Sequence, residues 1–144
     1  MPAESQVSAE LIDIYRATNF CVDLGGGACL TLHIEHYDAA LDELHRKRGV
    51  TTSVVITAYN PFSEMPADAV NCAAQERLLA EIDALGLAWL PASGADPGGR
   101  WAEASLFVLG MSRDEALDLG RQFRQNAVVF CGRDAIPSLL FCHY

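Results

Sequence analysis

Residues 54–59 read VVITAY, and every one of them is apolar or β-branched. A strand with one face in solvent alternates apolar and polar residues, whereas a strand covered on both faces is apolar throughout. The run therefore predicts a central strand with a packed layer on each side. Asn60-Pro61 follows directly and ends the strand, because proline lacks the N–H that a sheet ladder needs.

Helices and further strands are predicted on both sides of this segment. Helical spacing of apolar residues predicts helices over 36–48 and 66–85, and the capping-box pattern of Ser112 and Glu115 begins a third helix that ends near residue 123. Residues 11–15 predict only a short helical turn or docking segment. The β-prone runs are 19–24, 29–34, 87–90, 101–109, 127–131 and 136–141, with a glycine hairpin at 25–27, a turn-rich loop at 91–99 and an edge position for the last run because of Pro137.

Strands and helices do not alternate regularly in this order. The sequence therefore predicts an α+β fold with a mixed or mainly antiparallel sheet and about three helices. A length of 144 residues suits a single domain. We expect residues 1–10 to be a flexible N-terminus and residues 11–144 to form that domain.

The composition is that of an acidic globular protein, with 51% hydrophobic residues and a formal net charge of −9. Such a charge disfavours nucleic acid as a partner and favours a basic protein. No run approaches the ~20 apolar residues of a membrane span. The first residues carry no basic, apolar leader, so the expected location is the cytoplasm.

Cysteines and histidines do not form a motif. The five cysteines include no C-x-x-C pair, which favours free thiols in a reducing compartment. Free cysteines usually serve as small apolar residues. If one of the five is a reactive thiol, Cys72 is the best candidate, because it follows Asn71 at a predicted helix start. His33 and His36 straddle a strand–helix junction, so we expect no metal site, and no nucleotide or cofactor motif is present.

Three stretches, taken together, resemble a known family. They are TAYNPFS at 57–63, DPGGRWAEAS at 96–105 and LGRQFRQNA at 119–127, and YRAT at 15–18 fits the same pattern. The combination resembles the bacterial domain of unknown function 3293, over roughly residues 14–131. The resemblance implies a small, stand-alone bacterial domain and implies no activity. The chain departs from it at Arg124, where the family often has glycine, and this departure counts against a tight backbone turn there.

The first and third stretches supply polar residues next to predicted strands and helices. Asn60 lies where the central strand ends, which is a common ligand position, and Asn-Pro equally suits a plain turn. Ser63 precedes the long helix, where it could bind a ligand or cap the helix. Gln125 lies between the third helix and the next strand. Asn71 and Gln75 share one helix face, but the sequence does not show whether that face points into the protein.

The second stretch supplies acids and an indole. Trp101 and Glu103 project to the same face of a strand whose next inward residues are apolar, including Phe107. Desolvation there would raise the pKa of Glu103, as suits a general acid or base. The alternative is a salt bridge from Glu103 to Arg100, Arg121 or Arg124. Asp96 offers a second carboxylate, or serves only its own Asp-Pro-Gly turn.

Two hypotheses about function follow. In the first, the three stretches meet in one hollow and bind a small polar molecule: Glu103 and Asp96 are the acids, Asn60 and Gln125 orient the ligand, Trp101 stacks on it, and Ser63 completes the wall. In the second, the stretches are structural turns, and the acidic surface of a protein-interaction or regulatory module binds a basic protein. The sequence assigns no reaction and no oligomeric state.

Overall fold

The computed structural model describes residues 7–144. Within that range the chain forms one seven-stranded sheet, and every neighbouring pair of strands is antiparallel. The spatial order is β2-β1-β4-β5-β3-β6-β7. The strands are β1 (Asn19–Gly25), β2 (Ala28–Leu32), β3 (Ser53–Ile56), β4 (Trp89–Ala95), β5 (Ala102–Leu109), β6 (Ala127–Cys131) and β7 (Ser138–Phe141).

The described residues also form four α-helices and a short 3-10 turn. They are α1 (Ala9–Ala17), α2 (Ala39–Arg48), η2 (Pro61–Ser63), α3 (Asp68–Ala84) and α4 (Arg113–Gln122). The predicted α+β class is confirmed, and the capping box of Ser112 and Glu115 is present at the start of α4. The predicted helix count was one too low. The extra helix is α1, whose first turn is capped by the Ser8 hydroxyl, which accepts from the Leu11 N–H.

The predicted flexible N-terminus falls partly on residues 1–6, which lie outside the described residues. Ala9 and Glu10, also inside that predicted segment, form the first turn of α1.

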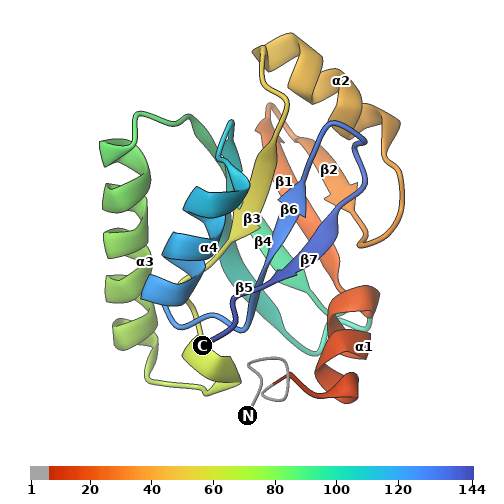
Figure 1. The fold of residues 1–144 in the computed structure, drawn as a ribbon. Coiled ribbons are helices and arrows are strands. Elements are labelled where there is room, and N and C mark those ends of the chain that lie inside the picture. Colours follow the sequence, from red (N-terminus) through yellow and green to blue (C-terminus); the bar gives the residue numbers. More distant parts are fainter. Residues whose placement is uncertain (1–6) are drawn as a thin grey trace.

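Both faces of the sheet are packed, as the VVITAY run predicted. Val54 and Ile56 contribute to a core with α3 and α4, which lie side by side over one face (Figure 1). Val55 points to the other face, where a curled sheet encloses a second core around Phe107. Leu41 of α2 belongs to that second core, and α1 lies at its opposite end (Figure 1). The concave face is therefore closed by α2 at one end and bordered by α1 at the other.

Strand β4 is longer than predicted and runs through part of the expected 91–99 loop. Pro91 lies inside it, opposite Leu106 of β5. On its other side β4 pairs with β1 only from Ala92, opposite Val22, to Ala95, so Pro91 lies outside that ladder although β1 itself continues to Gly25. Its missing N–H therefore leaves no ladder bond unmade on that side. Pro91 predicted a loop, but the strand continues through it because the neighbouring strand is not paired at that position.

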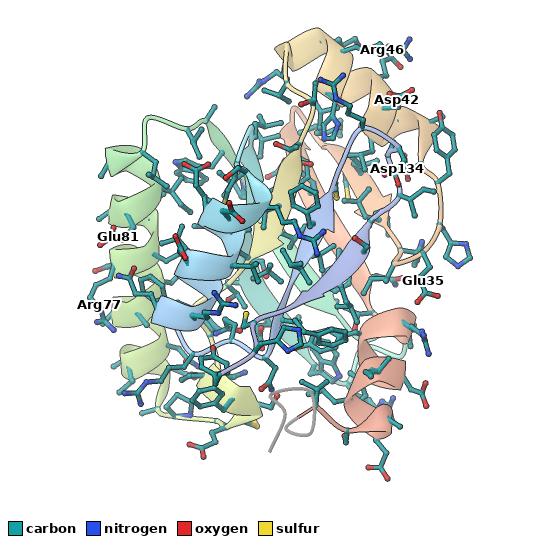
Figure 2. All side chains as sticks on the ribbon, in the orientation of Figure 1. Glu35, Asp42, Arg46, Arg77, Glu81 and Asp134 are labelled. Atoms are coloured by element: carbon teal, nitrogen blue, oxygen red, sulfur yellow. The ribbon has the colours of Figure 1, made fainter. Side chains whose placement is uncertain are left out.

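The α2 end of the molecule is closed by packing and local charge pairs. His45 is buried, with its Nε2 atom 2.7 Å from the Ser53 hydroxyl, and burial lowers the pKa of His45. Asp42 and Arg46 project outward from α2 and form an ion pair at 3.6 Å (Figure 2). Part of the basic cluster at the end of this helix thus pairs within the helix itself. Among the helices of residues 7–144, none combines the length and the apolar character that crossing a membrane requires.

Candidate functional site

Polar side chains gather at the α1 end of the curled sheet. Because all neighbouring strands are antiparallel, β3, β4 and β7 end at this edge while β1, β5 and β6 begin there. The edge therefore brings together segments that are far apart in the sequence. α1 and η2 lie at the same end of the molecule (Figure 1).

Asn60 and Glu103 are joined directly. The Asn60 Nδ2 atom donates to Glu103 Oε2 at 2.9 Å. Asn71, in the first turns of α3, holds Asn60 by two further bonds: its Nδ2 atom donates to Asn60 Oδ1, and its Oδ1 atom accepts from the Asn60 N–H, both at 2.9 Å. Gln75, one turn on, accepts from the Ala58 N–H at 2.8 Å. The shared face of Asn71 and Gln75 therefore points inward and fixes the segment after β3.

The turn after Asn60 has an unusual backbone. Asn60, Phe62 and Ser63 all adopt left-handed φ values, of 49°, 53° and 62°. The Phe62 N–H donates to the Arg124 carbonyl at 2.8 Å, and the Phe62 ring makes an edge contact with Tyr144. Such conformations cost of order 1–3 kcal/mol each and persist where surrounding contacts over-determine them, often at functional sites. Here those contacts hold the turn next to Glu103.

Glu103 is mostly buried and has no cationic partner among the described residues. Burial raises the pKa of the Glu103 carboxyl, and the bond from Asn60 partly opposes that rise. The salt bridge considered from the sequence is absent from residues 7–144. Arg100 instead pairs with Asp96, and the Arg121 Nε atom donates to the Cys142 carbonyl.

Tyr15 of α1 is the member of the site that the sequence arguments missed. Burial raises the pKa of its phenol to about 12, and the nearby Glu103 and Cys142 add to the rise. The hydroxyl therefore stays protonated at neutral pH. Helical periodicity gave Tyr15 no special role, and the available signal was that the YRAT stretch accompanies the other three motifs.

Two polar atoms of this cluster make no hydrogen bond within the described residues. Within residues 7–144, neither Glu103 Oε1 nor the Tyr15 hydroxyl has a hydrogen-bond partner. In the same residues no fully buried side-chain nitrogen or oxygen lacks a partner. Both atoms must therefore keep some contact with solvent. They are open positions to which a small molecule can bond.

Two hollows border α1, and Ile14 lines both of them. We name them by one residue each. The Ser63 hollow has a volume of about 470 Å³ and is lined by Ser8, Glu10, Leu11, Ile14, Phe62, Ser63 and Asn126. The Trp101 hollow has a volume of about 430 Å³ and is lined by Asp13, Ile14, Ala17, Thr18, Asp96, Pro97, Arg100 and Trp101. The Asn60–Glu103 bond links the turn beside the first hollow to the strand that begins beside the second.

The other predicted site residues, Ser63, Gln125 and Trp101, do not contact Glu103 through a hydrogen bond within the described residues. Ser63 lines its hollow and accepts from Asn126 Nδ2 at 3.1 Å. Gln125 is buried, and its Nε2 atom donates to the carbonyls of Tyr59 and Phe123, so it positions the turn that carries Asn60. Trp101 is 40% exposed in the Trp101 hollow.

Asp96 is occupied by its own loop. Its two carboxylate oxygens accept from the Arg100 guanidinium at 2.9 and 3.0 Å, and one also accepts from the Arg100 N–H. These bonds lower the pKa of Asp96 to about 2. The structure thus shows Asp96 stabilising its own turn through Arg100. Its role as a second acid stays a prediction.

A family model described as a protein of unknown function, DUF3293, matches residues 56–128, just over half of the chain. The chain belongs to this family. The DUF3293 match begins at the end of β3 and ends in β6, so it includes Asn60, Asn71, Glu103 and Gln125 but not Tyr15. No curated protein and no solved structure matches the chain.

The DUF3293 resemblance predicted a small residue where this chain has Arg124. The tight turn is nevertheless present: Arg124 has a left-handed φ of 56°. A non-glycine residue pays about 1–2 kcal/mol for this conformation, whereas glycine adopts it freely.

We expect Arg124→Gly to raise the free energy of unfolding by about 1 kcal/mol, measured by urea denaturation, because it relieves the left-handed strain. Arg124→Ala keeps that strain and is expected to give no gain. Equal stabilisation by both variants would show that loss of the charge, rather than relief of the backbone, is responsible.

Proposed function

We propose that this protein binds a small polar molecule at Glu103 and exchanges a proton with it. The observation that supports this is a mostly buried carboxyl that accepts from the neutral amide of Asn60 and has no ion pair with any residue from 7 to 144. A buried carboxylate without a cation destabilises a fold, and a neutral or apolar side chain would serve structure better. Groups that break a local rule in this way are expected at functional sites.

The roles of the other residues follow from their contacts. Asn60 orients the carboxyl, and Asn71 is a positioning residue that acts through Asn60. Tyr15 is a neutral hydrogen-bond donor beside Glu103. Trp101 offers an apolar surface for the body of the ligand. A carboxyl whose pKa is raised by burial keeps its proton to a higher pH than an exposed one, which is the direction that a general acid or base needs.

A reducing bacterial cytoplasm is part of the proposal. It is supported by the five cysteines of residues 7–144, all of which are free. They are Cys21, Cys29, Cys72, Cys131 and Cys142.

We expect Glu103→Gln to raise the free energy of unfolding at pH 7 by about 1 kcal/mol, because a neutral amide avoids the cost of burying an unpaired carboxylate. The direction of this change in stability follows from the difference between the folded and unfolded pKa values of Glu103. The folded pKa of Glu103 is raised, so the stability from its protonated form is complete below the unfolded value, near 4.5, and is lost as pH rises through the folded value. The advantage of the variant should therefore shrink at pH 4.

The matched control is Glu81→Gln, on the outer side of α3 away from α1 (Figure 2). It makes the same charge change and should leave stability within about 0.5 kcal/mol of the wild type. A loss of several kcal/mol in Glu103→Gln would instead assign Glu103 a structural role.

The proposed function is tested by thermal-shift screening of polar metabolites against the wild type and Glu103→Gln. A ligand at 100 times its Kd stabilises the folded state by about 2.7 kcal/mol, which is a shift of several degrees. We expect hits that raise Tm in the wild type and lose that effect in the variant. Hits that shift both proteins equally would contradict a site at Glu103, and the absence of hits would leave the basic-partner hypothesis as the better one.

A further inference from the structure

The proposed site contains an acidic group that has no cationic partner in the described residues. We infer that its ligand carries a cationic nitrogen, an amine or an amidine, which pairs with Glu103, and an apolar body that lies against Trp101 in the Trp101 hollow. This inference rests on the proposed function and adds the chemical class of the ligand.

Within residues 7–144, no ion pair joins Glu103 to a cation. The groups whose electrostatic influence joins them to Glu103 are Asn60, Tyr15 and Tyr59. All three are neutral at pH 7, because an amide does not titrate and the ordinary pKa of tyrosine, near 10, is raised further here. The thiol of Cys142, beside Tyr15, is also neutral, because burial raises its pKa to about 11. An ammonium or amidinium group would therefore be the charge partner that Glu103 lacks in the described residues.

The oxygens without hydrogen bonds have the chemistry that such a group needs. Glu103 Oε2 accepts from Asn60, while Oε1 makes no hydrogen bond within residues 7–144 and keeps solvent contact. The Tyr15 hydroxyl also makes none there. A cationic nitrogen carries two or three N–H donors, so one can go to Oε1 and leave another for a second acceptor such as the Tyr15 oxygen. A ligand carboxylate would instead lie beside the negative charge of Glu103 and be repelled by it.

The Trp101 hollow adds only a small negative charge. Asp13, Asp96 and Arg100 line it, but Asp96 is bound by Arg100, and Asp13 lies 3.8 Å from the exposed Arg16. The chain as a whole carries a net charge of −9, which attracts cationic ligands at long range.

Trp101 connects this hollow to Glu103. The Trp101 carbonyl accepts from the Asp96 N–H at 3.0 Å, so the β4–β5 ladder continues one step past Ala102. Trp101 and Glu103 therefore lie on one face of the strand, about 7 Å apart along it. The indole is 40% exposed. Indoles attract cations and pack against apolar groups, so a ligand that spans both residues uses both properties.

The test uses four small probes of one shape: benzylamine, benzamidine, benzyl alcohol and benzoate. Their binding to the full chain at pH 7 is measured by protein-detected NMR titration. We expect both cations to bind about tenfold more tightly than benzyl alcohol, and benzoate to bind more weakly still. Glu103→Gln should remove about tenfold of the cation affinity, whereas Glu81→Gln should leave it unchanged. Trp101→Ala should weaken the two cations and benzyl alcohol together.

The outcomes separate this inference from the proposed function. If benzyl alcohol or benzoate binds as tightly as the cations and Glu103→Gln weakens it, the Glu103 site stands and the charge preference is wrong. If the cations bind equally to the wild type and Glu103→Gln, the inferred pairing is wrong. If neither these probes nor the metabolite screen yields Glu103-dependent binding, the proposed function fails as well.

Discussion

Replacing Asn71 by alanine is expected to lower the free energy of unfolding by about 3 kcal/mol. Asn71 is buried and makes two hydrogen bonds to Asn60, one to its backbone N–H and one to its side-chain oxygen. Truncation leaves both groups without their partners, and each partly buried polar group left unpaired costs about 1–3 kcal/mol. The left-handed backbone at Asn60 also loses a contact that holds it.

Urea denaturation of three variants measures this effect. Asn71→Leu keeps most of the volume and is expected to be nearly as unstable as Asn71→Ala, because the hydrogen bonds, not the packing, are the main loss. Asn19→Ala removes an amide whose oxygen lies 2.7 Å from His33 Nε2 at an exposed position, and should cost less than about 1 kcal/mol. Wild-type stability in Asn71→Leu would contradict the assigned role of these bonds.

A double-mutant cycle distinguishes positioning of Glu103 from a purely structural role. If Asn71 acts on Glu103 through Asn60, the stabilisation by Glu103→Gln should change by about 1 kcal/mol when Asn71 is already alanine. Residues that do not share a network add independently. Strict additivity would therefore remove Asn71 from the Glu103 site while leaving its effect on stability.

The second large change in stability is expected for a substitution at Gly120 of α4. Helix propensity alone favours alanine over glycine by about 1 kcal/mol. A Cβ atom at Gly120, however, would lie 2.7 Å from Cys142 Sγ and 3.1 Å from Val128 Cγ1, and both residues are buried. Overpacking a close-packed core costs about 1–3 kcal/mol and here outweighs propensity. We expect Gly120→Ala to destabilise the protein by about 2 kcal/mol.

Thermal and urea denaturation of Gly120→Ala, alone and combined with Cys142→Ala, tests the cause. Removing the sulfur vacates the space that the new methyl group needs. The double variant should therefore be more stable than the sum of the two single changes predicts, by about 1 kcal/mol. Simple additivity would contradict the steric explanation, and stabilisation by Gly120→Ala alone would show that α4 can shift without cost.

These residues explain why the stretch at 119–127 forms a unit. Gly120 lets α4 approach Cys142 and Val128, and its carbonyl accepts from the Gln125 N–H at 2.9 Å. Arg124 makes the left-handed turn, and Gln125 then holds the segment that carries Asn60. The stretch is therefore a connection between a helix and β6 that also supports the neighbouring site.

Much of the fold could be predicted because its signals are local. The apolar run of β3, the capping box of α4 and the periodicity of α3 are each contained within one segment. α1 was underestimated because none of its residues is fully buried, so its apolar pattern is short and incomplete. The length of β4 was underestimated because the tolerance of Pro91 depends on where the pairing between β1 and β4 ends.

Local periodicity, propensity and capping in the amino-acid sequence are enough to encode the class of fold, most of the elements, the turn after Asn60 and the placement of Glu103 on an inward face. The contacts of the site arise only on folding. Asn60 bonds to Glu103, 43 residues away, Asn71 supports Asn60, and Arg100 binds Asp96. Tyr15 of α1 comes close enough for Glu103 to raise the pKa of its phenol. The physical reason is that such contacts depend on strand order, register and the path of α1, which no single segment encodes.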